Sequence, residues 1–143
     1  MIRIVRLHDL PAGMEELRAE ATADGIRNMG LLVSQWLDGT QRYDKPGEAM
    51  FGAFEGERLA GIGCVKIETG AAEPAMRMRR LYVARGARGK GVGRALAVAM
   101  IARGFERTAL LTCNAVPPGA AEFWDAMGFS RVAAGGWTHE KRR

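Results

Sequence analysis

The chain has 143 residues, of which 48% are hydrophobic and 26% are charged. This length is typical of one domain, and the apolar share is large enough for a core, which argues against intrinsic disorder. No run approaches the roughly 18 to 20 apolar residues that cross a bilayer, and charges interrupt the amino-terminal sequence too early for a secretory signal. We therefore expect a single domain over residues 1–143, located in the cytoplasm.

The positive charge of the chain is concentrated in one segment. The formal net charge is +5, which suits nucleic acid, a membrane surface or a small anion as partner. Segment 77–94 holds seven bases and no acid, which leaves 14 bases and all 16 acids for the rest of the chain, a net charge of −2. Four of the 19 glycines also lie in this segment. Such a local charge favours one small anionic ligand over a membrane or a polynucleotide.

Cysteine and histidine are too few and too scattered for a metal site. Cys64 and Cys113 belong to no C-x-x-C pair, and His8 and His139 are the only histidines. This count argues against a disulfide framework or a zinc site, and it favours two buried thiols in a reducing compartment. We expect both histidines at the surface and no bound metal.

Hydrophobic periodicity and turn residues predict the elements along the chain. Asn28 is expected to cap the second helix, Gly39 to end it, Gly56 to turn a hairpin and Gly128 to end the last helix. A run of strands followed by a strand–helix–strand unit indicates a mixed sheet with helices on its faces, an α/β or α+β fold. The predicted elements are a strand at 2–7, helices at 13–24 and 28–38, a hairpin within 49–67, a strand at 75–83, a helix at 92–103, a strand at 108–113, a helix at 119–127 and a strand at 129–133, extended or followed by 137–140.

The segment 79–96 joins a strand to a helix through a glycine-rich basic loop. Glycines let successive amides turn inward without a Cβ in the way, and the helix start adds unpaired N–H groups and a positive dipole end. The pattern predicts a phosphate or pyrophosphate site, with Arg88, Lys90 and Arg94 around it. It is not a Walker P-loop, because Gly91 follows Lys90 where serine or threonine should stand. A dinucleotide-binding fingerprint would lie after the first strand of a strand–helix–strand unit early in the chain, whereas this loop follows a late strand.

Two motifs resemble those of the GNAT superfamily, the CoA-dependent N-acetyltransferases. The first is R-x-x-G-x-G at 88–93, preceded by Leu-Tyr-Val at 81–83 and followed by Arg-Ala-Leu at 94–96. The second runs from Asn114 through the Phe-Trp-Asp-Ala-Met-Gly-Phe sequence at 123–129 and is similar to the late N…A…(L/F)Y-x-x-x-G-F segment of that family. The order of the predicted elements also matches, so the resemblance covers nearly the whole chain.

The resemblance implies a mixed, mostly antiparallel central sheet with a splayed parallel pair of strands, flanked by helices on both faces. It implies acetyl-CoA as cosubstrate, with its pyrophosphate on the amides of 88–93 and its pantetheine arm along Leu81 and Val83. The Val83 amide would stabilise the oxyanion, Asn114 would lie near the pantetheine amides, and Phe123 and Trp124 would lie beside the thiol. The implied cofactor-binding residues are Leu81, Tyr82, Val83, Arg88, Gly89, Lys90, Gly91, Val92, Gly93, Arg94, Asn114, Phe123 and Trp124.

The sequence departs from the family at two groups that move protons. Trp124 stands where many relatives have a tyrosine that protonates the leaving thiolate, and Arg77 stands near the position of a glutamate that serves as base. We take Glu73 as the candidate base and Tyr82 as the candidate acid. Alternatives are Glu68 for the base, and Tyr43 or solvent for the acid.

The resemblance places the acceptor amine between the early helices and the central strands. Trp36, Tyr43, Phe54, Arg77 and Arg79 are therefore candidate substrate-binding residues, although Trp36 also fits a helix core. Arg77 and Arg79 share one face of a strand and could hold a carboxylate, which favours an amino acid or another small anionic amine.

Three functions remain open at this point. The first is an acetyl-CoA-dependent N-acetyltransferase that acts on a small-molecule amine by direct transfer, without metal. The second is a catalytically weak module that binds or senses acyl-CoA, which the two departures keep open. The third, nucleic-acid binding, is disfavoured because the loop uses several of the seven bases. Dimers are common in the resembled family, which leaves a homodimer open.

Overall fold

A mixed sheet of seven strands forms the centre of the structure, a computed structural model that describes residues 1–133 and 135–143. The strand order is β1-β2-β3-β4-β5-β7-β6, and β4 and β5 form the one parallel pair in it. The elements are β1 (Ile2–Leu7), α1 (Met14–Ala23), α2 (Asn28–Asp38), β2 (Ala49–Glu55), β3 (Arg58–Ile67), β4 (Ala75–Val83), the 3-10 turn η1 (Arg85–Ala87), α3 (Val92–Phe105), β5 (Leu110–Cys113), α4 (Ala120–Ala126), β6 (Ser130–Arg131) and β7 (His139–Arg142).

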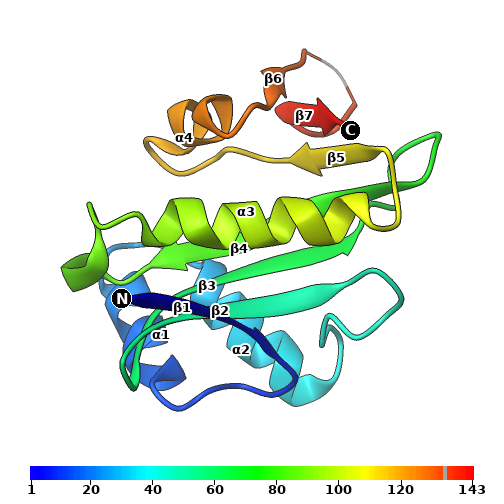
Figure 1. Cartoon of the computed structure of the whole chain (residues 1–143). Coiled ribbons are helices and arrows are strands. Elements are labelled where there is room, and N and C mark those ends of the chain that lie inside the picture. Colours follow the sequence, from blue (N-terminus) through cyan, green and yellow to red (C-terminus); the bar gives the residue numbers. More distant parts are fainter. Residues whose placement is uncertain (134) are drawn as a thin grey trace.

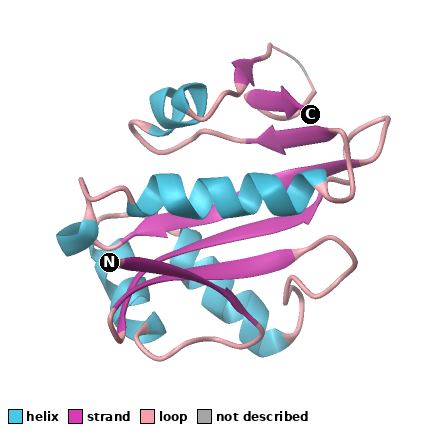
Figure 2. Ribbon diagram, in the orientation of Figure 1, coloured by secondary structure: helices cyan, strands magenta, loops and turns pink. Residues whose placement is uncertain are grey.

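Helices cover both faces of the sheet, as the sequence predicts. Figure 1 shows α3 lying along one face and α1 and α2 behind the other, and Figure 2 separates the same elements by type. The core lies between the sheet and the helices on each of its two faces. It includes Met29 and Leu32 of α2, Ile62 of β3, and Leu96 and Met100 of α3. The predicted fold class is confirmed.

Element ends agree with the expected turn residues except at one helix. Gly39 ends α2 in a left-handed conformation (φ +80), and Gly56 turns the β2–β3 hairpin at φ +58. Asn28, however, does not cap α2: no side chain caps this helix, and the Asn28 amide donates to the Leu81 carbonyl of β4 instead (3.1 Å). The expectation of a capping role was wrong because Arg27 is the N-cap and Asn28 is the first helical residue, with its side-chain oxygen buried and without a hydrogen-bond partner.

The parallel pair in the sheet is short. Pairing of β4 with β5 runs only from Ala75–Leu110 to Met78–Cys113, and β5 ends at Cys113. The last part of β4, Arg79 to Val83, therefore has an edge that no strand covers. This splay is the feature of the fold that positions the candidate site.

No helix in the described part of the chain is both long enough and apolar enough to cross a bilayer.

Candidate functional site

The open edge of β4 presents backbone amides that no strand uses. The Ala84 amide donates to the Ala60 carbonyl of β3 (2.8 Å). Because amides alternate between the two sides of a strand, the Val83 amide points away from β3, toward the open edge. The carbonyls beside it are held by side chains: Arg88 Nε donates to the Val83 carbonyl (3.1 Å), and Asn28 donates to that of Leu81. Two carbonyls of this edge are thus hydrogen-bonded, and the Val83 amide is left as a donor that faces it.

The glycine-rich loop continues from this edge into α3. Gly89 and Gly91 have φ of +79 and +83, and Gly91 is the N-cap of α3 with no side-chain cap. The amides of the first turn of α3 therefore lack intrahelical partners. A Cβ on Gly89 or Gly91 would meet no atom within 4 Å, so the loop faces open space. The geometry is that of an anion site at a helix start.

The basic side chains of the loop differ in how they are used. Arg94 is exposed, and Lys90 is exposed with an ion pair to Glu55 at 3.4 Å. Arg88 folds back, with its guanidinium 5.5 Å from the centre of the Tyr82 ring and Nη2 3.3 Å from the Tyr82 hydroxyl. Arg88 therefore braces the end of β4, while Lys90 and Arg94 remain at the mouth of the loop.

Segments after β5 close the other side of the splay. Asn114 follows β5 directly and is exposed, and Phe123 of α4 lies 3.4 Å from the Cβ position of Gly93. Trp124 is buried and packs edge-on against Phe123 and Phe129, with ring centres 5.1 Å apart in both pairs. Phe123 thus borders the loop and helix start, while Trp124 belongs to the core beneath it.

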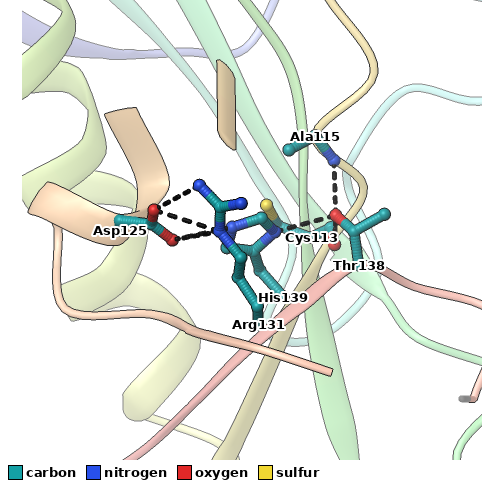
Figure 3. A network of polar contacts seen from close by, with 6 residues as sticks. All are labelled: Cys113, Ala115, Asp125, Arg131, Thr138 and His139. Atoms are coloured by element: carbon teal, nitrogen blue, oxygen red, sulfur yellow. Dashed lines mark hydrogen bonds and ion pairs between the residues drawn. The ribbon is translucent and has the colours of Figure 1, made fainter. Parts of the chain in front are cut away.

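A polar network around the buried His139 fixes the end of β5 (Figure 3). His139 of β7 is 2% exposed, with Nε2 3.0 Å from Asp125 Oδ1 and Nδ1 2.8 Å from the Thr138 hydroxyl. That hydroxyl in turn accepts from the Ala115 amide (2.8 Å). The expectation of a surface His139 was wrong: a short strand pair and α4 enclose it. Neither strand is long enough for the sequence pattern to show this.

The two residues taken as candidate proton carriers lie away from the open edge. Glu73 is exposed in the loop before β4 and pairs with Arg142 at 2.8 Å. It thus lies beyond the start of β4, and the strand from Ala75 to Val83 alone spans about 26 Å at 3.3 Å per residue. Tyr82 points to the opposite face from Val83 and donates to Glu20 of α1 at 2.6 Å. Burial and that carboxylate raise the pKa of Tyr82 to about 12. The structure does not bring either group to the splay.

Glu68, the alternative base, lies much closer to it. The Glu68 carboxylate is 3.0 Å from Arg77 Nε and accepts from the Thr112 hydroxyl at 2.8 Å. Arg77 and Thr112 face each other one residue before β4 and β5 separate. Burial alone would raise the pKa of Glu68, but the Gly70 amide, the Thr112 hydroxyl and the nearby cations hold it below its usual value. Glu68 is therefore ionised at neutral pH.

The candidate acceptor residues do not form one group. Trp36 is 7% exposed within the core, and Phe54 lies two strands away from β4, under the Arg3 guanidinium at 5.3 Å. Tyr43, Arg77 and Arg79 do come together, on the α2 side of β4. Sequence reasoning missed Lys66 and Arg80, which join them there; no periodicity signals the backbone irregularity at Arg80 (φ +58).

Both cysteines are free and buried, as expected. Among residues 1–133 and 135–143, no cluster of histidine, cysteine and carboxylate side chains is suited to hold a metal ion.

Comparisons with known proteins agree with this geometry. Residues 13–129 match the family model described as the acetyltransferase (GNAT) family. A candidate acetyltransferase from Exiguobacterium sp. 255-15 is similar over 99% of this chain and 93% of its own, at 24% identity and a TM-score of 0.88. The Bacillus subtilis N-acetyltransferase YlbP, solved in complex with coenzyme A, covers 100% of this chain and 97% of its own, at 20% identity and a TM-score of 0.68. At these identities the structures show a shared fold. No curated protein matches the chain.

Proposed function

Because this chain belongs to the GNAT acetyltransferase family, we propose that it transfers an acetyl group from acetyl-CoA directly to the primary amine of a small molecule. The observation that carries the proposal is the continuity of two backbone features. An open edge of β4 with a free Val83 amide leads, within a few residues, into a glycine loop. There the Arg88 amide donates to the Arg85 carbonyl (3.5 Å), and the amides from Gly89 to the first turn of α3 have no such backbone partner. We propose that residues 1–143 act as one domain in the cytoplasm, where the two free thiols would stay reduced.

The loop fits the diphosphate of CoA. Free amides from Gly89 to Arg94 and the positive end of α3 would bind phosphate oxygens, and Lys90 and Arg94 would add charge at the rim. Positive φ at Gly89 and Gly91 turns successive amides to one side, where open space leaves room for a phosphate. In this proposal Leu81 and Val83 would hold the pantetheine arm, between β4 and the segment that begins at Asn114.

The chemistry needs few side chains. The acceptor nitrogen attacks the thioester carbonyl, the C–S bond then breaks, and the thiolate leaves. The Val83 amide would donate to the carbonyl oxygen as negative charge develops there, and one such donor contributes about 10²- to 10³-fold in rate. Holding amine and thioester together in a ternary complex supplies much of the remaining acceleration.

Proton transfers are assigned to groups within reach of the splay. Glu68 is ionised and lies where the strands part, but Arg77 beside it is six residues, about 20 Å at 3.3 Å per residue, from Val83. It would therefore take the ammonium proton of the acceptor through a chain of waters rather than directly. Water would take the second proton, which the nitrogen loses as the amide forms, and would protonate the thiolate, because the Tyr82 hydroxyl is engaged with Glu20. Glu73, paired with Arg142 far along the strand, has no part in this scheme.

A second function is favoured by one observation. Trp124 stands at the motif position of the usual tyrosine and is buried, so this position offers no side-chain acid to the thiol. A module that binds acyl-CoA but transfers its acyl group slowly would show this feature.

Two measurements on the same protein separate the candidates. Calorimetry with CoA tests the loop, and thiol release from acetyl-CoA across a panel of amines and amino acids tests transfer. We expect binding and turnover with at least one amine. Binding without turnover on any acceptor supports the module, and absence of CoA binding overturns both functions.

The loop itself is tested by Gly91→Glu. This change places a side chain and a negative charge where the diphosphate would bind, and we expect it to abolish CoA binding. Gly39→Glu is the matched control. Gly39 also has a positive φ (+80), and only the flexible end of Arg42 lies within 4 Å of its Cβ position, at 3.9 Å. It lies away from the loop, at the far end of α2. Equal CoA affinity in the Gly91→Glu variant and the unmodified protein would mean that the diphosphate binds elsewhere.

A further inference from the structure

Four cationic side chains gather on the α2 face of the sheet, at the start of the splay. Arg77 and Arg79 lie on this face because Met78, between them, points to α3, where its methyl group lies 3.4 Å from the Cβ position of Gly104. Lys66 of β3 pairs with Arg77 in the antiparallel register, so its side chain is on the same face. Arg80 completes the group. All four side chains are partly buried.

A backbone irregularity brings Arg79 and Arg80 to one face. Successive residues of a regular strand point to opposite faces. Here the register of β3 with β4 shifts between Ile62 and Cys64, and Arg80 adopts the left-handed conformation at φ +58. Its guanidinium then reaches Gln35 of α2 at 3.3 Å. This conformation is costly for a residue other than glycine, and such strain is typical of functional positions.

Only one of the four cations is neutralised by an acid. Arg77 is paired with Glu68 and also donates to the Gly136 carbonyl at 3.1 Å. In the described part of the chain, no carboxylate lies within ion-pair distance of Lys66, Arg79 or Arg80. Glu48, the other carboxylate whose charge affects the pKa of Lys66, is 2% exposed and accepts from the Ile67 and Lys45 amides.

The burial of these cations without acids leaves polar atoms unsatisfied. Burial and the neighbouring Arg80 lower the pKa of Arg79, and burial and Arg79 lower that of Lys66. Arg80 Nε and the Tyr43 hydroxyl are buried without a hydrogen-bond partner, and the whole Tyr43 residue is only 3% exposed. Burial raises the pKa of that hydroxyl, and the charges of Arg80 and Arg79 offset part of this rise. Buried polar groups are normally satisfied, so this set lacks an acceptor.

We propose that Arg79, Arg80 and Lys66, with the Tyr43 hydroxyl, bind an oxyanion, a carboxylate or a phosphate, that the acceptor amine carries. The inference rests on the proposed function and specifies its substrate class: a small anionic amine rather than a neutral amine or a polyamine. Arg79 and Arg80 directly precede Leu81, where β4 is open, so an anion held there would leave the amine near the edge. Arg77, which the sequence pairs with Arg79, instead positions Glu68.

The test compares acceptors that differ only in charge. The panel holds amino acids against their carboxamides, and O-phosphoethanolamine against ethanolamine, with acetyl-CoA saturating. We expect the acids to be acetylated with at least a tenfold higher kcat/KM than the neutral partners. The two arms distinguish a carboxylate from a phosphate ligand. Equal kcat/KM for acids and neutral amines would overturn the inference while leaving acetyl transfer in place.

Variants of Arg79 link this selectivity to the cluster. Arg79→Gln should lower kcat/KM for the anionic acceptor about 10- to 100-fold, the usual effect of losing a hydrogen bond to a charged group, and should leave the KM for acetyl-CoA unchanged. Arg79→Lys, which keeps the charge but not the bidentate fork, should lie between. Arg107→Gln removes the same charge from an exposed turn after α3 and should change nothing. A loss that is equal for acid and carboxamide would contradict the assignment.

Product binding keeps the test independent of turnover. With CoA present, N-acetyl amino acids should bind the unmodified protein by calorimetry, whereas N-acetyl amino acid carboxamides and the Arg79→Gln variant should show little binding. If CoA binds but acids bind no better than carboxamides, the anion site is absent even where no amine is acetylated. If CoA itself does not bind, the proposed function is wrong. The anion site is then supported only if N-acetyl amino acids bind in the absence of CoA.

Discussion

The Glu68 carboxylate is surrounded by groups that favour its ionised form. Burial would raise its pKa, but the Gly70 amide, the Thr112 hydroxyl, Arg77 and Lys66 outweigh that effect and lower the pKa below its usual value. A carboxyl whose folded pKa is lowered stabilises the fold above the unfolded pKa of about 4.3, and this contribution is lost as pH falls through the folded pKa.

Glu68→Gln should therefore reduce stability in a pH-dependent way. We expect the unmodified protein to have the higher midpoint of thermal unfolding at neutral pH, and the difference to shrink between about pH 5 and pH 3. Thr112→Val removes one of the hydrogen bonds to Glu68. Its unfolding midpoint should therefore lie between those of the unmodified protein and Glu68→Gln. A gap between the unmodified protein and Glu68→Gln that stays constant across this range would show that Glu68 has an ordinary pKa.

His139 should matter for stability although it bonds to no part of the open edge of β4. Replacement by alanine removes two hydrogen bonds and leaves a cavity beside Asp125 and Thr138 (Figure 3). We expect His139→Ala to lower the free energy of unfolding by about 2–4 kcal/mol in urea denaturation. His8→Ala, at the chain's other and exposed histidine, should leave it unchanged. A cost below about 0.5 kcal/mol for His139→Ala would mean that the network contributes little.

These residues also show where sequence reasoning stops at this scale. The glycine loop was predictable because its chemistry is local: each residue contributes a backbone amide where the chain itself places it. Arg80, Lys66 and His139 were not, because their roles depend on a register shift and on strands of a few residues. Glu73 and Glu68 lie in the same loop between β3 and β4, so the sequence does not distinguish them as candidate bases. The loop conformation alone places Glu73 beside Arg142 and Glu68 beside Arg77.

At the scale of elements, the order of strands and helices follows from the sequence almost completely. The strand at 75–83 has the predicted bounds, and α3 extends only two residues beyond the predicted end. Strong apolar patterns and glycine turns explain this agreement. The last strands differ most, since β6 and β7 have two and four residues and carry little periodic signal.

Close packing of α3 and β4 against β3 explains two of the 19 glycines. A Cβ on Gly61 would lie 2.9 Å from the Tyr82 carbonyl oxygen and 3.0 Å from Leu96, and one on Gly63 would lie 2.5 Å from the Met100 sulfur. These glycines let the helix approach the strand. Gly30, within α2, has no such reason, because nothing lies within 4 Å of its Cβ position.

The two kinds of glycine predict opposite effects of the same substitution. Gly61→Ala should destabilise the protein by about 1–3 kcal/mol, because a backbone carbonyl cannot move aside as a side chain can. Gly30→Ala should stabilise it by about 0.5–1 kcal/mol through helix propensity. Chemical denaturation measures both. Similar values for the two variants would contradict the proposed close contact of Gly61 with the Tyr82 carbonyl of β4 and with Leu96 of α3.

At the scale of the whole molecule, the sheet consists of two parts joined by a short seam. Strands β1 to β4 form one part and β5, β7 and β6 the other, and the parallel pairing between them covers four residue pairs. Figure 1 shows α4 with β5, β6 and β7, on one side of α3. In the proposed function, CoA would fill the splay that continues this seam and would contact both parts.

Ligand binding should therefore stabilise the molecule unevenly. CoA at 100 times its Kd adds about 2.7 kcal/mol to the free energy of unfolding, and the added contacts would bridge the seam. We expect hydrogen exchange to slow most in segment 110–131, whose strands and α4 are tied to β4 by few pairs, and least in the β1–β2 pair. Gly91→Glu should show no such protection. Uniform slowing across the sheet would indicate that CoA stabilises the fold without bridging its two parts.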